Sequence, residues 1–510
     1  MDRRHGLFLF KALFFLLIVQ ILGGLKDCNP KNDACKCDEN SYNLSNRSGS
    51  HVRDLRKLSY RNNTTCINFN DNNIPELTCD DFSPIPNSVK RLYFRNCKIK
   101  SIQCENLFEN LTNLMVFDIG YNELETNAFI DIFTSVEQAS KLSKLSLSIS
   151  GNNLSENVSF SFLHKLKRFR ADACKINNLH QILQTNETNN SLKSLSLRRN
   201  LINETSLEAF YDHGEQYPML NSLVLSLNPV KNFNRNVFSR LQKLRKLWIA
   251  NFQAFNTTFP GIKCSRLDLL DISNSFSFNP VEEVINVFNI SRNISFLFLS
   301  GTDLVNWTEN DLLQLLNPLS ELKSLNLYNT SLTQVPCNLL RAIKSLEFID
   351  LSKNYIAGWN KTCFIDMPET FKKLYLSQNR IITINETSFP QQFVKQLIHL
   401  HLSGNLFKCD CSTHWFRSWM RDHYGILDAL SKDNSTAFVF YECHSPQNNG
   451  TLLVDFDPTY EECHGLSIAE LLSLSISGFC FVLILTLNAL IKFNYRKGYE
   501  EIGEFSMVKL

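Results

Sequence analysis

One spacing of apolar residues recurs along most of this 510-residue chain. In its clearest copy, from Leu346 to Ile356, apolar side chains stand at positions 1, 4, 6 and 11, and Asn354 stands at position 9. The centre of the copy alternates inward-facing and outward-facing residues, which is typical of a short strand. The turn after the strand leaves buried backbone groups without partners. We therefore expect the amide of Asn354 to be buried and to bind backbone atoms.

Further copies follow every 23 to 28 residues. Their first positions are Val89, Leu114, Leu142 or Lys144, Leu166, Leu192, Leu220, Leu244, Leu267, Ile294, Leu322, Leu346, Phe371 and Leu397. One copy cannot bury its own apolar face, so the thirteen copies must stack. The spacing predicts an α/β fold, a leucine-rich-repeat solenoid (horseshoe), over residues 87–407.

Position 9 varies among the copies. It is held by Asn, or by Cys, which the motif also allows, at Cys97, Asn122, Asn152, Cys174, Asn200, Asn228, Asn354, Asn379 and Asn405. The departures are Phe252, Ser275, Thr302 and Thr330. Around Leu142 two registers compete, two residues apart, so we expect a local bulge or insertion there.

Composition indicates an extracellular protein. The chain is 44% hydrophobic and 20% charged with a net charge of +2, so nucleic-acid binding is not indicated. Sixteen cysteines, clustered at both ends of the repeats, predict disulfides in an oxidising compartment. Nineteen N-x-[ST] glycosylation sequons support this compartment. They begin at Asn43, Asn46, Asn62, Asn63, Asn110, Asn153, Asn157, Asn186, Asn189, Asn203, Asn256, Asn289, Asn293, Asn306, Asn329, Asn360, Asn385, Asn434 and Asn449.

The N-terminus is typical of a secretory signal peptide over residues 1–24. Arg3, Arg4 and Lys11 precede the apolar run 12–22. The alternative, a membrane anchor, needs a run about twice as long. Residues 25–86 are then expected to form an N-terminal cap over the open end of the stack.

The cysteines of this cap are better explained by disulfides than by a metal, since no His or acidic set with zinc spacing accompanies them. They are Cys28, Cys35, Cys37 and Cys66. Cys79 and Cys104 lie one repeat apart, as do Cys337 and Cys363, so each pair could sit on neighbouring turns. Cys264 has no such partner and is expected to be a buried thiol.

Residues 408–464 contain Cys409-Asp410-Cys411, the aromatic stretch 415–419, and later Cys443 and Cys463. This arrangement resembles the C-terminal cap of leucine-rich-repeat ectodomains. The stretch 443–456 is similar to that cap in Toll-like receptors. The resemblance implies that Cys409 pairs with Cys443 and Cys411 with Cys463.

Residues 471–491 carry no charge, and as a helix of ~32 Å they match a hydrocarbon core of ~30 Å. Lys492, Arg496 and Lys497 follow this run and Glu470 precedes it. The positive-inside rule therefore predicts a single-pass type I protein of the plasma membrane or an endosome, with its ectodomain outside.

The tail, residues 492–510, leaves no room for the cytoplasmic Toll/interleukin-receptor domain that the family carries. This departure predicts a co-receptor or a decoy. Within the tail, Tyr499 to Ile502 resembles an endocytic signal and also a ligand of phosphotyrosine-reading domains.

Strand residues at positions 3, 5 and 7 are expected to line the concave face. Thirteen strands spaced by ~4.8 Å make it ~60 Å long, enough for a protein or polymer partner. An exposed aromatic band is expected to bind the ligand. Its members are Trp248, Phe296, Phe298, Tyr328, Phe348 and Tyr375. Arg168, Arg170 and Arg198 are further candidates, for which a solvated face is the simpler interpretation.

Catalytic motifs such as G-x-S-x-G, H-E-x-x-H, phosphate loops and dinucleotide fingerprints do not occur, so neither an enzyme nor a cofactor is predicted. The sequence predicts an innate-immune receptor that binds a protein or microbial ligand, with a signalling co-receptor or a second copy as partner. A leucine-rich-repeat adhesion or organising protein is the alternative.

Overall fold

The computed structural model describes residues 41–45, 55, 58–139, 142, 144–154, 158–185, 190–279, 281–427, 441–446, 448–459, 463 and 468–505. The predicted signal peptide, Cys28, Cys35, Cys37 and the sequons at Asn46, Asn157, Asn186, Asn189 and Asn434 lie outside these residues. The chain divides into a larger unit, residues 1–330 with 342–346, and a smaller unit, residues 331–341 with 347–510.

The larger unit is built on a parallel sheet to which each repeat contributes one short strand. In spatial order the strands are β1 (Ser41–Asn43), β2 (Cys66–Asn68), β4 (Arg91–Tyr93), β6 (Val116–Asp118), β7 (Ser146–Ser148), β8 (Arg168–Arg170), β9 (Ser194–Ser196), β10 (Ser222–Val224), β11 (Lys246–Trp248), β13 (Leu269–Asp271), β15 (Phe296–Phe298) and β16 (Ser324–Asn326). From β4 onward, every strand covers positions 3 to 5 of a predicted repeat. The predicted repeats are thus confirmed as one parallel strand each.

The smaller unit continues the same plan with β17 (Phe348–Asp350), β18 (Lys373–Tyr375) and β19 (His399–His401), paired in parallel register. Its helices are α9 (Cys337–Ala342), α10 (Gln391–Gln396) and α11 (His414–Asp422). Phe364 stacks on Phe393 with ring centroids 4.6 Å apart, and Phe389 stacks on Trp419 at 5.8 Å. Trp419 of α11 therefore packs against the repeat that contains Phe389.

One further repeat lies inside the segment that the sequence assigns to the N-terminal cap. Ile67 and Phe69 are fully buried, and Asn72 stands at position 9 of a unit whose strand is β2. The Asn72 amide donates to the carbonyls of Leu44 and Phe69, at 3.0 and 2.7 Å. The apolar pattern does not detect this copy, because a buried threonine, Thr64, replaces leucine at position 1.

Near Leu142 the sequence predicts a bulge or an insertion, and the described strand residues that follow show no bulge. Strand β7 pairs with β6 and with β8 in unshifted register, which selects the copy that begins at Lys144. Leu142 and Leu145 are nevertheless buried and fill the core position that the exposed Lys144 leaves. The extra residues are accommodated earlier, in helix α3 (Thr126–Gln138), because a longer helix adds length without changing the strand pairing.

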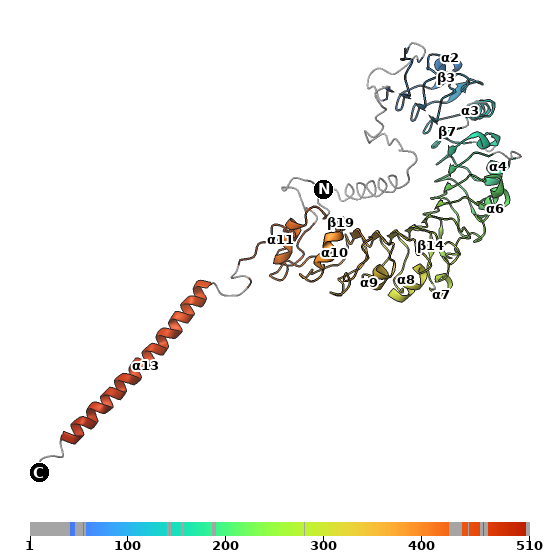
Figure 1. The fold of residues 1–510 in the computed structure, drawn as a ribbon. Coiled ribbons are helices and arrows are strands. Elements are labelled where there is room, and N and C mark those ends of the chain that lie inside the picture. Colours follow the sequence, from blue (N-terminus) through green and yellow to red (C-terminus); the bar gives the residue numbers. More distant parts are fainter. Residues whose placement is uncertain are drawn as a thin grey trace. The chain divides into compact units, whose positions relative to one another are not determined.

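Helices and turns occupy the other side of each repeat (Figure 1). In the larger unit they are α2 (Cys79–Phe82), α3, η2 (Ser161–Lys165), α4 (Leu179–Leu183), α5 (Glu204–Leu207), α6 (Ala209–His213), η3 (Gly214–Gln216), α7 (Val281–Val284) and α8 (Glu309–Leu316). Helix α3 buries Phe129, Ile132 and Phe133. Phe133 stacks on Phe162 with ring centroids 4.0 Å apart, so the core between strands and helices is largely aromatic here.

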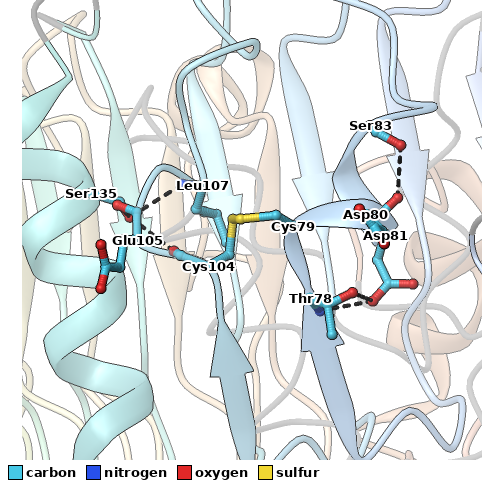
Figure 2. The surroundings of a disulfide bond; sticks show 9 residues. All are labelled: Thr78, Cys79, Asp80, Asp81, Ser83, Cys104, Glu105, Leu107 and Ser135. Atoms are coloured by element: carbon cyan, nitrogen blue, oxygen red, sulfur yellow. Dashed lines mark hydrogen bonds between the residues drawn. A yellow bond between two sulfur atoms is a disulfide. The ribbon is translucent and has the colours of Figure 1, made fainter.

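Two short sheets accompany the main one: β3 (Glu76–Thr78) with β5 (Ser101–Gln103), and β12 (Ala254–Thr258) with β14 (Phe276–Ser277). Figure 2 shows β3 and β5 leading into Cys79 and Cys104, which form a disulfide with Cα atoms 4.8 Å apart. Beside it, the hydroxyl of Ser135 on α3 donates to the carbonyl of Glu105 at 2.6 Å. Neighbouring repeats are thus joined both covalently and by hydrogen bonds.

Helix α13 (Ile468–Phe505) contains the predicted span 471–491. Its segment Leu472–Lys492 is the stretch, among the residues described, that is long and apolar enough to cross a membrane. The helical backbone continues through Tyr499 and Ile502 to Phe505. The hydroxyls of Ser473 and Ser477 donate to the carbonyls of Glu470 and Leu474 on the same helix.

Candidate partner-binding face

The strand face is defined here as the side chains at positions 3, 5 and 7 of the repeats. All nine ligand candidates lie on it, because they occupy strand ends or the second residue after a strand. Within the larger unit these are Arg168, Arg170, Arg198, Trp248, Phe296, Phe298 and Tyr328. Phe348 and Tyr375 lie in the smaller unit. The structure therefore assigns the expected aromatic band to two separate units.

The aromatic residues of the larger unit form a packed cluster. Trp248 and Phe298 are only 9% and 6% exposed and pack with Leu269, while Val224 and Phe296 are partly buried against them. This apolar cluster spans four consecutive strands, β10, β11, β13 and β15. The expectation of freely exposed rings is wrong for Trp248 and Phe298, because both pack in one cluster with Leu269, Val224 and Phe296 from neighbouring strands.

The aromatic residues of the smaller unit also pair. The rings of Phe348 and Tyr375 meet edge to face with centroids 4.8 Å apart. Tyr375 stacks on His401 at 3.8 Å. Tyr375 and His401 face each other in the β18–β19 register, so the row is a direct consequence of cross-strand pairing.

One of the three arginine candidates, Arg170, pairs with an acid on the strand face. Arg170 Nε lies 3.0 Å from a carboxylate oxygen of Asp172. The other oxygen of Asp172 accepts from the backbone N–H of Arg198 at 2.8 Å and from the hydroxyl of Ser196 at 2.6 Å. Arg168 differs, because its register partners are Ser146 and Ser194 and no ion pair joins it to an acid within the described chain.

Buried carboxylates on the strand face were not anticipated from the sequence. Asp118 and Asp350 are 8% and 3% exposed, and each accepts from the N–H two residues later. Burial raises the pKa of Asp350 to about 6, against hydrogen bonds from Ser352. Burial also raises the pKa of Asp118, although Arg95 at 3.6 Å opposes this shift. A position-5 Asp followed two residues later by Ser or Gly is the signal that could have found them.

The asparagine at position 9 works as predicted. Asn354 is 4% exposed; its amide donates to the carbonyl of Leu351 at 2.9 Å, and its oxygen accepts from the N–H of Leu332 at 3.0 Å. Repeats without asparagine at position 9 make fewer of these side-chain hydrogen bonds to the backbone. Ser275 still donates to the carbonyl of Ile249, whereas the buried hydroxyl of Thr302 has no hydrogen-bond partner.

The cysteines that the structure describes are mostly paired. Besides Cys79–Cys104, the disulfides are Cys337–Cys363, Cys409–Cys443 and Cys411–Cys463. Cys66 is also disulfide-bonded. Cys264 is a buried thiol, as are Cys97 and Cys174, which replace asparagine at position 9. Burial raises the pKa of each of these three thiols to about 12, so they stay uncharged.

The sequon asparagines that fall within the described ranges are all exposed. From β2 to β16 none of them lies in a strand of the main sheet. Asn256 stands in the separate strand β12, and Asn203 caps helix α5. Glycans at these sites would leave the strand face open from β2 to β16, whereas Asn43 is itself a residue of β1. In the same described ranges no group of three or more His, Cys, Asp and Glu residues could hold a metal ion.

The repeat strands, the buried position-9 asparagines and the strand face define a leucine-rich-repeat protein. Comparison with known proteins narrows the class, although no family model matches the chain. Toll-like receptor 7 of Mus musculus is 26% identical over 354 residues, which cover 67% of this chain and 33% of that protein. Transforming growth factor beta activator LRRC33 of Danio rerio is 25% identical over 285 residues, 51% of this chain and 40% of that protein. The chain thus resembles leucine-rich-repeat ectodomains of the Toll-like receptor type.

Two further similarities are partial. Adenylate cyclase of Schizosaccharomyces pombe is 25% identical over 473 residues, which cover 88% of this chain but 25% of the enzyme. Among solved structures, that of a TLR13–ssRNA13 complex covers 82% of this chain and 64% of its own, with a TM-score of 0.48 and 19% identity. This chain spans between a quarter and two fifths of the length of the three curated relatives.

Proposed function

We propose that this protein is a single-pass membrane receptor in innate immunity and that it binds a partner protein through the strand face of its larger unit. The apolar cluster of Val224, Trp248, Leu269, Phe296 and Phe298 carries the proposal. A strand face in contact with water usually presents polar side chains, and contiguous apolar patches on soluble surfaces often mark interaction sites. Similarity to Toll-like receptor 7 supports the receptor class.

The composition of this face also suits a protein partner. Interfaces place apolar and aromatic side chains at the centre and polar or charged ones at the rim. Here Phe296 and Val224 are the partly exposed members of the cluster, and Ser222 and Lys246 stand beside them on β10 and β11. No sequon asparagine lies in strands β10, β11, β13 or β15.

The test compares two single changes in the full chain on cells. Phe296→Ser removes a partly exposed member of the cluster, whereas Phe255→Ser removes a ring that is 64% exposed on β12, outside the cluster. We expect Phe296→Ser to reach the surface normally but to lose co-precipitation with co-expressed Toll-like receptors, and Phe255→Ser to retain it. Equal retention by both variants would refute the strand-face proposal.

The narrower role of co-receptor or decoy is tested with the same cells. A reporter for Toll-like receptor signalling, read with and without this chain, should rise for a co-receptor and fall for a decoy. A leucine-rich-repeat adhesion protein would change cell aggregation and leave the reporter unaltered. The type I orientation is tested separately by enzymatic removal of N-glycans, which would lower the apparent mass if the ectodomain enters the secretory lumen.

A further inference from the structure

A row of five residues, three of them cations, borders the larger unit where the chain enters its strands. The row consists of the position-2 residues Lys167, Lys193, Asn221, Arg245 and Asp268. Each backbone N–H donates to the carbonyl of the residue before it in the row, at 2.7 to 3.0 Å. Neighbouring members are therefore about 4.8 Å apart along the sheet. In the sequence they are more than 20 residues apart, so the row exists only in the folded repeats.

Further cations extend this row into an edge. Arg168 and Lys246 occupy position 3 of β8 and β11, while Lys243, Lys263 and Arg266 lie in the segments that lead into β11 and β13. The acidic residue among these cations is Asp268. None of these cations forms an ion pair with a carboxylate within the part of the chain that the structure describes. We call this surface, from Lys167 to Arg266, the basic edge.

The basic edge also contains a hollow. Its volume is about 200 Å³, and its lining includes Ser239, Gln242, Lys263, Ser265, Arg266 and Ile290. Two cationic side chains and several hydroxyl or amide groups thus surround one recess. Such a lining offers charge-assisted hydrogen bonds to an anionic group.

We propose that the basic edge binds a linear sulfated polysaccharide. Concentrating cations on one edge of a chain whose net charge is only +2 creates a local positive field that attracts a polyanion. Repeated spacing along the sheet suits a polymer with regularly spaced charges.

Other polyanions fit less well. Single-stranded nucleic acid is usually held by aromatic side chains on which bases stack, and no aromatic residue belongs to the basic edge. A protein interface usually has an apolar centre. In the hollow the exposed large hydrophobic side chain is Ile290, which by itself does not form such a centre. The basic edge meets the apolar cluster at Lys246. The edge variant tested below leaves Lys246 and the cluster unchanged, so the proposal does not depend on the proposed partner-binding function.

The test measures binding of heparin to the full chain purified in detergent, as a function of NaCl concentration. The variant combines Lys193→Gln, Arg245→Gln and Arg266→Gln, which change three exposed side chains of the edge. The control combines Lys98→Gln, Lys175→Gln and Arg199→Gln, three exposed cations that follow their strands instead of preceding them. Both triple variants lower the net charge equally.

We expect the edge variant to weaken heparin binding roughly tenfold or more near physiological salt, and to reduce the slope of log Kd against log[NaCl] by about one unit for each cation removed. The control variant and Phe296→Ser should bind like the unmodified protein. Thermal unfolding of both triple variants should match it too, since the changed side chains are exposed.

Three results would overturn the proposal. Equal weakening in the control variant would show attraction by net charge alone. Equal binding of chemically desulfated heparin would exclude recognition of sulfate. Tighter binding of a single-stranded oligothymidylate than of heparin, lost in the same edge variant, would assign the edge to nucleic acid instead.

Discussion

The side-chain oxygen of Asn354 lies 3.0 Å from the backbone nitrogen of Leu332, a residue of the preceding turn, and accepts its hydrogen. The same side chain donates to Leu351 and Ser352. One short amide thus satisfies backbone groups of two successive turns, which would otherwise lack these partners.

Removal of the Asn354 side-chain amide should therefore destabilise the folded chain. We predict that Asn354→Ala lowers the free energy of unfolding by ~1–3 kcal/mol, because buried backbone groups lose their partners. Asn221→Ala is the control, since Asn221 is exposed on the sheet edge. Hydrogen exchange of β17 and β18 in the full chain reports the effect locally. Equal protection in both variants would argue against this role of Asn354.

The C-terminal disulfides are predicted to hold the last repeat closed. Cys411–Cys463 joins residues 52 positions apart beside helix α11, and Cys409–Cys443 joins residues 34 positions apart. The double change Cys411→Ser with Cys463→Ser should destabilise the smaller unit by roughly 2–5 kcal/mol. Non-reducing peptide mapping should recover both linked pairs from the unmodified protein. Recovery of a different pairing would contradict the structure.

Mild acidification should raise the unfolding free energy of the smaller unit, because it protonates Asp350 in the folded chain. Its pKa is about 6 in the folded chain, against an ordinary value near 3.9 in the unfolded chain. Between these values the folded state holds a proton that the unfolded state has released, so the unfolding free energy increases as pH falls. The contribution is at most about 2 to 3 kcal/mol, and it is lost as pH rises through 6.

Asp350→Ala isolates this contribution. Asn is unsuitable here, because Asn followed by Leu351 and Ser352 would create a glycosylation sequon. We expect the stability difference between the unmodified chain and Asp350→Ala to be larger at pH 4.5 than at pH 7. The exposed Asp366→Ala serves as the control. A difference that does not change with pH would refute the assignment.

Trp248 should behave as a structural residue. It is 9% exposed and packs with Leu269 and Phe298, so Trp248→Ala should cost about 3–5 kcal/mol. Phe255→Ala should cost less than about 0.5 kcal/mol, because that ring is 64% exposed. Thermal unfolding of the two variants in the same detergent distinguishes them. Similar melting temperatures would show that the apolar cluster contributes little to the fold.

The sequence by itself determined the repeat, because burial of every turn requires the same side chains at the same spacing. Leu346 to Ile356 specified a strand, a turn and a buried Asn354, and all three are present. The period also placed Cys79 beside Cys104 and Cys337 beside Cys363. The repeat with Thr64 at position 1 was not predicted, because a search for apolar residues at fixed positions does not detect a buried threonine.

Only the tertiary structure decided what the strand face and its edge present. Exposure of Trp248 and Phe298 depends on apolar side chains contributed by neighbouring strands, and the raised pKa of Asp350 depends on how completely the surrounding chain excludes water. The basic edge likewise joins Lys167, Lys193 and Arg245, which the sequence separates by one or two repeats. A repeat motif fixes the position of each residue within its own turn, whereas side-chain exposure and charge density arise between turns.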